Sequence, residues 1–203
     1  MNQLGDLDVS RETIERLKIY EAMLHKWNAK INLVAKSTLL DVWTRHILDS
    51  AQLFSIPDHP IEHWADLGSG GGFPGLVIAI LAADQKSPSQ VTLVESDSRK
   101  CTFLRSVLRE TGAVAKVVSE RIEEISALNA DVVSARALAD LTTLFSLAHP
   151  HVRPGGLMLF SKGEKWKTEV QEAQTKWQFI QRVVKSKTSD GPVILCATGV
   201  VRV

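Results

Sequence analysis

A glycine-rich segment, Asp66 to Gly75, constrains this chain more than any other feature. It follows an apolar strand-like run, His63–Leu67, and precedes an apolar helix-like run, Leu76–Ala83. Glycines adopt positive φ angles and let a ligand approach the backbone, and a helix N-terminus offers unpaired N–H groups to polar ligand atoms. The order of strand, glycine loop and helix therefore predicts a cofactor cradle within an α/β fold.

Beyond Pro57 and Pro60 the sequence alternates short apolar runs with amphipathic segments, a pattern typical of a parallel sheet covered by helices on both faces. Further strands are expected near Gln90–Glu95, Ala115–Ser119, Asp131–Ala135 and Gly156–Ser161, with helices beginning near Gly75, Ser98, Asp140 and Glu164. Trp177–Lys187 and Val193–Val203 should form an antiparallel pair, because the turn between them leaves no room for a helix. This order resembles the Rossmann-like sheet of class I methyltransferases, which is mostly parallel with an antiparallel last strand.

Two helices are expected before the sheet. The apolar residues from Ile14 to Ile31 recur at three- and four-residue steps, and Thr38 with Asp41 suggests a capping box for a second helix that reaches Phe54. We therefore expect a helical cap over residues 1–60 and a Rossmann-like methyltransferase domain over residues 61–203.

The chemistry of the glycine loop leaves two cofactor classes open. Gly70, Gly72 and Gly75 satisfy GxGxxG, and Glu95 stands at the end of the next strand, where a carboxylate can accept hydrogen bonds from ribose hydroxyls. An NAD-dependent oxidoreductase is one interpretation. Asp66 argues against it, because an acid at the end of the first strand suits a cofactor with a cationic amino-acid tail and would repel a pyrophosphate.

Four separated segments resemble one family, the bacterial 16S ribosomal RNA guanine-N7 methyltransferases, also called glucose-inhibited division protein B. They are Asn32–Ala35, His46–Ser50, the loop Asp66–Gly75 and Ser134–Ala137, with a looser match from Pro154 through Gly163. The resemblance spans about residues 14–163, and the phrase GxGFPG together with HxxDS is more restrictive than the glycines alone.

The resemblance implies that the chain binds S-adenosyl-L-methionine. The residues it points to are Gly68, Phe73, Ile122, Glu123 and Arg136. Gly70 of the loop and Glu95, by the ribose argument, complete the expected cofactor site. All seven follow the carboxyl ends of predicted strands, where open α/β sheets bind their ligands.

Guanine N7 carries a lone pair and no proton, so methylating it requires no general base. We accordingly assign no catalytic base and no nucleophile, and the sequence has neither a HExxH motif nor a His/Cys cluster that would indicate a metal site. Catalysis would come from holding the reacting atoms in line, which can supply roughly 7–11 kcal/mol.

The resemblance also implies 16S ribosomal RNA, or an assembling small subunit, as the partner. The formal net charge is only +1, so RNA contact needs a local basic patch. The candidates border the matched segments: Lys30, Lys36, Arg45, Arg136 and Lys162. His46 and Asp49 lie on one helical face, where they suit a structural hydrogen bond between cap and core. A non-catalytic RNA-binding assembly factor is a further alternative.

We expect a cytoplasmic monomer without a membrane anchor. No apolar run approaches the roughly 18 residues that span a bilayer, and the N-terminus lacks the pattern of a secretory signal. Cys101 and Cys196 lie far apart and belong to no metal motif, which favours a reducing compartment.

Overall fold

Alternating strands and helices follow the expected order in the computed structural model, which describes residues 2–58 and 60–203. The strands are β1 (Asn2–Leu4), β2 (Leu7–Val9), β3 (His63–Leu67), β4 (Gln90–Val94), β5 (Lys116–Val118), β6 (Ala130–Arg136), β7 (Val152–Lys162), β8 (Trp177–Lys185) and β9 (Val193–Arg202). The α-helices are α1 (Arg11–Asn28), α2 (Asp49–Phe54), α3 (Gly75–Gln85), α4 (Ser98–Thr111), α5 (Leu141–Ala148) and α6 (Trp166–Ala173). Three short helices of other types are η1 (Lys36–Asp41), η2 (Trp43–Leu48) and η3 (Ile122–Glu124).

Seven of the described strands form one sheet in the order β5-β4-β3-β6-β7-β9-β8. Neighbours from β5 to β7 run parallel, while β9 lies between β7 and β8 and is antiparallel to both. The expected mostly parallel sheet with an antiparallel last strand is confirmed. Because β3 and β6 are neighbours although two other strands separate them in sequence, the order of the sheet reverses beside β3, where open α/β sheets form ligand crevices.

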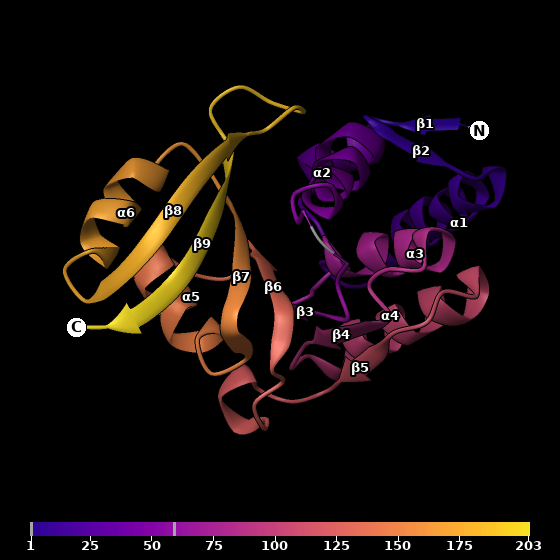
Figure 1. The fold of residues 1–203 in the computed structure, drawn as a ribbon. Helices are drawn as coiled ribbons and strands as arrows, with labels where there is room; N and C mark the ends of the chain where they lie inside the picture. The colour runs from indigo at the N-terminus through magenta and orange to yellow at the C-terminus, as the bar shows by residue number, and fades with distance from the viewer. Residues whose placement is uncertain (1, 59) are drawn as a thin grey trace.

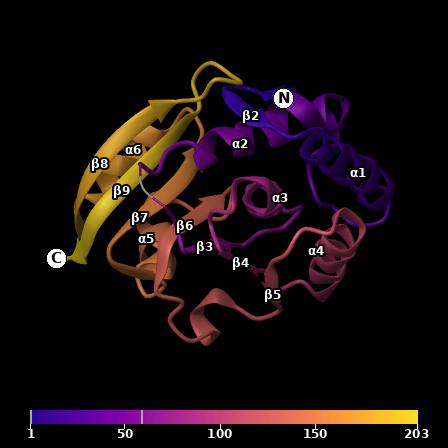
Figure 2. The ribbon, with the colours of Figure 1, turned by 45° about the vertical axis from the view of Figure 1, so that its right-hand side comes forward.

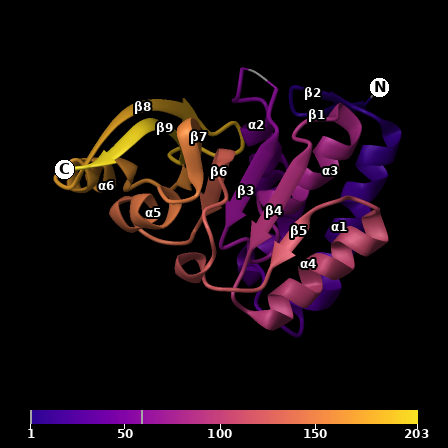
Figure 3. The ribbon, with the colours of Figure 1, turned by 60° about the horizontal axis from the view of Figure 1, so that its bottom comes forward.

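Helices cover both faces of the sheet (Figure 1). Helices α1, α3 and α4 pack against one another on one face, with α2 beside α3, while α5 and α6 pack together on the other face. Figure 2 shows α1, α2 and α3 gathered on one side of the sheet, and Figure 3 separates α5 and α6 from them. This two-faced covering explains why residues such as Val132 and Val133, neighbours on β6, are both fully buried.

The first helix, α1, begins directly after Ser10. The hydroxyl of Ser10 accepts a hydrogen bond from the backbone N–H of Thr13 at 3.1 Å, which caps the N-terminus of α1. Leu17, Tyr20 and Leu24 of the expected apolar face are fully buried. Ile31 lies beyond the end of the helix, and the hairpin of β1 and β2 was not anticipated from its three-residue strands.

The capping box expected at Thr38 and Asp41 is wrong. Both residues lie inside the 3₁₀ helix η1, where the Thr38 hydroxyl donates to the carbonyl of Ala35 at 2.9 Å. The chain then passes through the π-helix η2 before α2 begins. A periodicity argument assumes one regular helix, whereas this segment changes its hydrogen-bond spacing twice.

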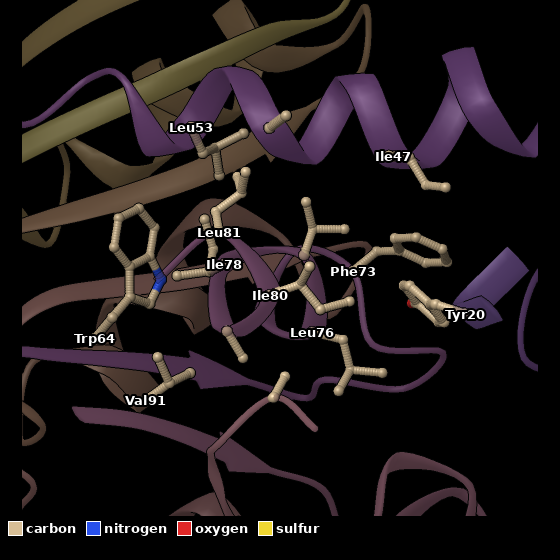
Figure 4. Close-up of a cluster of buried hydrophobic side chains, with 14 of the residues drawn as sticks. Tyr20, Ile47, Leu53, Trp64, Phe73, Leu76, Ile78, Ile80, Leu81 and Val91 are labelled. Carbon is tan, nitrogen blue, oxygen red and sulfur yellow. The ribbon is translucent and has the colours of Figure 1, made fainter. Parts of the chain in front are cut away.

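One hydrophobic core joins the N-terminal segment to the sheet. The cluster that contains Tyr20, Ile47 and Leu53 also contains Trp64 of β3 and Leu76 of α3, as the close-up in Figure 4 shows. Since burying apolar surface supplies most of the stability of a domain, these segments stabilise each other. A division of the chain near residue 60 stays a prediction.

Candidate active site

A cavity of about 680 Å³ opens at the carboxyl ends of β3, β4 and β6. Its lining comes from the glycine loop, from the segments after β4, β5 and β6, and from the stretch Leu33–Thr38 of the N-terminal segment. It brings together all seven residues expected at a cofactor site, namely Gly68, Gly70, Phe73, Glu95, Ile122, Glu123 and Arg136. Their contact with a cofactor stays a prediction.

The glycine loop is shaped by backbone conformations that other residues resist. Gly68 has φ +65°, and a Cβ atom there would lie 2.7 Å from Cδ1 of Leu138. The loop is tied to its neighbours because Ser69 N–H donates to the carbonyl of Val94 at 3.0 Å. The positive φ angle therefore favours glycine at position 68, and a larger residue would also displace the end of the Leu138 side chain.

Asp66 supports the loop from beneath. Its carboxylate is fully buried and accepts hydrogen bonds from the Ser134 hydroxyl at 2.7 Å and from the Gly75 N–H at 3.2 Å. Burial raises the pKa of Asp66 to about 6. Asp66 is not among the residues that line the cavity, so it shapes the cavity through the loop that it holds.

Glu95 follows β4 and fixes two backbone segments at once. Its Oε2 accepts from the Gly70 N–H at 2.9 Å, and its Oε1 accepts from the Asp97 N–H at 2.8 Å. The residue is 8% exposed and lines the cavity. Each carboxylate oxygen can accept a second hydrogen bond, so Glu95 can still receive hydroxyl donors from a ligand.

Ile122 and Glu123 stand on η3, which follows β5. Ile122 is buried and its carbonyl is contacted by Nε2 of His151 at 3.1 Å, whereas the Glu123 side chain is exposed. Together they offer the cavity an apolar wall beside a carboxylate at its edge.

Arg136, the last residue of β6, connects the sheet to the N-terminal helices. Its Nη1 donates to Oδ2 of Asp49 at 3.3 Å, and its Nη2 donates to Nδ1 of His46. Burial lowers the pKa of Arg136 from its usual value, while the carboxylate of Asp49 opposes that shift. Burial and the charges of Arg136 and Arg45 lower the pKa of His46 to about 4, so this imidazole is neutral at pH 7.

Phe73 lies in an aromatic stack inside the cavity wall. Its ring centroid is 5.1 Å from that of Tyr20 and 4.8 Å from that of His46, and the guanidinium carbon of Arg136 lies 5.8 Å from the ring centre. The rings of Phe73 and Tyr20 face each other in Figure 4. Phe73 is thus both a cavity residue and a core residue, only 7% exposed.

Sequence reasoning missed two contributions of the N-terminal segment to the site. The Tyr20 hydroxyl donates to the carbonyl of Gly71, and Leu33, Val34 and Thr38 line the cavity. Tyr20 belonged to the expected apolar face of α1, and a tyrosine there signals a hydrogen bond, because a buried hydroxyl needs a partner.

Apart from Arg136, which is bonded to Asp49 and His46, the candidate RNA-binding cations separate into two groups. Lys30, Lys36 and Arg45 are exposed and form no ion pair within the part of the chain that the structure describes. Lys162 is 8% exposed, donates to the carbonyl of Ala139 at 3.0 Å and pairs with Glu169. The expectation that Lys162 contacts phosphate does not fit this burial, and its charge is already neutralised.

Residues 2–58 and 60–203 contain neither a metal-binding cluster nor a membrane-spanning helix. These residues hold no group of three or more His, Cys, Asp or Glu side chains arranged to bind a metal ion. None of their helices combines the length and the apolar character that crossing a membrane requires.

Comparison with known proteins gives matches over nearly the whole chain. A family model described as rRNA small subunit methyltransferase G, GidB, matches residues 13–192. The ribosomal RNA small subunit methyltransferase G of Ruegeria pomeroyi is 54% identical over 198 residues, which cover 97% of this chain and 96% of the relative. That of Rhodospirillum centenum is 51% identical over 187 residues, 92% of this chain and 84% of the relative.

Solved structures share the fold at low sequence identity. A methyltransferase from Geobacter sulfurreducens superposes with a TM-score of 0.60 and 12% identity over 96% of this chain and 99% of its own. The TYW2 protein of M. jannaschii, crystallised with AdoMet, gives 0.56 and 14% over 86% and 80%. The sheet, the crevice and these likenesses agree on the fold expected from the sequence, that of class I methyltransferases.

Proposed function

The chain belongs to the family described as rRNA small subunit methyltransferase G, and we propose that it methylates the N7 atom of a guanine in 16S ribosomal RNA. Membership makes it an S-adenosylmethionine-dependent methyltransferase of small-subunit ribosomal RNA. The acceptor atom is the proposed part. The family is one of methyltransferases. This membership favours neither of the two alternatives from the sequence, an NAD-dependent oxidoreductase and a non-catalytic assembly factor.

The cavity beside the glycine loop carries the proposal, because its residues fit S-adenosylmethionine. Gly68 and Gly70 have φ values of +65° and +53°, which would strain any other residue. Without a Cβ atom, both also leave space for a ligand beside the backbone. The free lone pairs of Glu95 suit a ribose diol, and the apolar side chains of Val94, Ile122 and Leu138 suit an adenine ring. Arg136 would meet the polar end of the ligand.

Bound S-adenosylmethionine supplies an electrophilic methyl group. Guanine N7 carries no proton, so its methylation requires no base, and the buried imidazole of His46 in the cavity lining is not free to act as one. Both nitrogens of His46 already have partners, Arg136 and Thr38. The remaining task of Phe73, Arg136 and the loop is to orient donor and acceptor in line, an effect that can supply roughly 7–11 kcal/mol.

We further propose that the partner is 16S ribosomal RNA or an assembling small subunit, bound by a monomer in the cytoplasm. The exposed cations Lys30, Lys36 and Arg45 support RNA binding, since cations near the reacting base can pair with phosphates. Lys36 stands on η1, directly after cavity residues Val34 and Ala35.

A transcript of the 16S RNA tests the acceptor atom. The protein should transfer labelled methyl from S-adenosylmethionine to this RNA or to small subunits, and nucleoside mass spectrometry should find the label in 7-methylguanosine. A transcript made with 7-deazaguanosine, in which N7 is a C–H group, is the control and should accept no methyl. Label in another nucleoside, or transfer to the 7-deaza transcript, would contradict N7.

A further inference from the structure

A second pocket of about 240 Å³ adjoins the cavity described above. The two share Arg136 and Ala137, so one stretch of chain at the end of β6 forms the wall between them. Ala137 has φ +51°, a left-handed conformation that L-residues rarely adopt. The backbone is thus held in an unfavourable conformation at the boundary of two pockets, which is typical of functional sites.

The floor of the second pocket is a row of side chains across three neighbouring strands. Arg136 of β6 is paired with Ser161 of β7, and Ser161 is paired with Ile194 of β9. Paired residues project from the same face of a sheet, so these three side chains stand side by side. The hydroxyl of Ser161 has no hydrogen-bond partner among the described residues, so it is available to a ligand.

The walls of this pocket are held by Asp49. Its Oδ1 accepts from the hydroxyls of Thr188 at 2.9 Å and Ser186 at 3.3 Å, and its Oδ2 accepts from Arg136. These bonds tie the segment between β8 and β9 to α2 and to the end of β6. The pocket is therefore a built structure in which two segments, distant in sequence, are hydrogen-bonded to one carboxylate of a third segment.

The second pocket carries a positive charge at Arg45 that no ion pair among the described residues balances. Asp49 is paired with Arg136, and Lys162 is paired with Glu169, so their charges cancel locally. Arg45, which also lines the pocket, is exposed and has no ion pair among residues 2–58 and 60–203. The surplus positive charge at this rim favours a ligand that carries a phosphate.

We propose that the second pocket binds the acceptor nucleotide, with its guanine over Ser161 and Ile194 and its phosphate at Arg45. The inference rests on the proposed function. In a paired RNA helix the edge of guanine that carries N7 faces a major groove too deep and narrow for side chains to enter, so the acceptor base has to be presented outside the helix. The second pocket has room for a single base beside the larger cofactor cavity. Arg136 can donate to guanine O6, while the hydroxyls of Ser161 and Thr188 can accept from its N–H groups.

The variant Ser161→Leu fills the floor of the second pocket without touching the cofactor cavity. It should lower kcat/KM for the RNA at least 50-fold, mainly through KM, and leave the Kd for S-adenosylmethionine within twofold. Ser146→Leu is the matched control, since Ser146 is exposed on α5, across the sheet, and should change neither quantity more than twofold. Ser161→Val, which suits a strand better, should give a smaller loss of the same kind and serves if Ser161→Leu does not fold.

A titration with guanosine 5′-monophosphate separates this inference from the proposed function. The nucleotide should shift the backbone amide resonances of Gly163, Thr188 and Ser189 saturably in the unmodified protein, and not in Ser161→Leu. Normal RNA kinetics in Ser161→Leu would overturn the inference and leave the function standing. If the unmodified protein methylates no guanine, the function fails, and the presence or absence of these shifts still decides the pocket.

Discussion

Arg136 donates a hydrogen bond to Nδ1 of His46, and this bond decides where the imidazole carries its proton. A guanidinium has no acceptor, so Nδ1 must accept and the hydrogen resides on Nε2. Nε2 lies 2.8 Å from the hydroxyl of Thr38, which in turn donates to the carbonyl of Ala35 at 2.9 Å. One line of donors thus runs from the end of β6 to the segment that lines the opposite side of the cavity.

Replacing His46 by Gln should flatten the acid side of the stability profile. The pKa of His46 is about 4 in the folded protein and about 6.5 in an unfolded chain, so between these values the unfolded chain binds more protons. Stability should therefore fall as the pH drops from 6.5 towards 4, by about 2 kcal/mol at pH 5 relative to neutral pH. Urea unfolding at pH 7.5 and pH 5 measures this difference, and equal losses in both proteins would contradict it.

Asp66 opposes this trend in both proteins. Its raised pKa of about 6 lets the folded form take up a proton first, so stability should increase as the pH falls from 6 towards 4. Since the variant retains Asp66, its contribution cancels when the two profiles are subtracted.

Arg136→Lys keeps the charge and should still weaken the site. A lysine ammonium lacks the planar fork that contacts His46 and Asp49 together. We expect the Kd for S-adenosylmethionine to rise about tenfold, a change worth about 1.4 kcal/mol, measured by calorimetry. Arg153→Lys is the control, because Arg153 pairs with Asp131 at the other end of β6 and β7. An effect of equal size in both variants would assign Arg136 a purely structural role.

Gly68→Ala should abolish measurable cofactor binding, while Gly112→Ala should not. The two glycines have nearly the same φ, +65° and +67°, so each alanine should cost roughly 1–2 kcal/mol of stability. Only at Gly68 would the new Cβ meet a neighbour, Leu138, whereas Gly112 has open space around it. Thermal unfolding and cofactor titration of both variants separate strain from blockage. Retained affinity in Gly68→Ala would mean that the cofactor binds elsewhere.

Glu95→Gln tests a carboxylate that serves the loop and the cavity together. An amide nitrogen cannot accept the N–H of Gly70 or Asp97, so one of these donors loses its partner. We expect about 1–2 kcal/mol lower stability and at least tenfold weaker S-adenosylmethionine binding. Glu124→Gln, an exposed neighbour of the site outside its lining, should leave both unchanged. Unchanged cofactor affinity in Glu95→Gln would remove Glu95 from the ribose contact.

The sequence predicted the sheet better than the helical cap, for a physical reason. Runs such as Gln90–Val94 and Ala130–Arg136 are apolar because both faces of a central strand are buried, and glycines mark the loop unambiguously. In contrast, η1 and η2 depend on contacts with distant residues, such as that between His46 and Arg136, which local periodicity does not encode. Lys162 was misjudged likewise, since its partner Glu169 lies on a helix that only the fold brings close.

The seven expected cofactor residues came mostly from motif resemblance, and the structure gathers them around one cavity. The sequence did not predict that the N-terminal segment contributes to the cavity. Tyr20 and Leu33 reach the loop only because α1 packs on α3 and α4, a tertiary arrangement without a local signature.

The hydroxyl of Tyr20 donates a hydrogen bond to the carbonyl of Gly71, a residue 51 positions later in the chain. The cavity beside the loop is likewise lined both by the N-terminal segment, at Leu33 and Val34, and by residues that follow the strands of the sheet. A protein that lacked α1 would therefore lose more than an accessory helix. The carbonyl of Gly71 would lose its hydrogen bond from Tyr20, and the loop would lose the contacts that hold its shape.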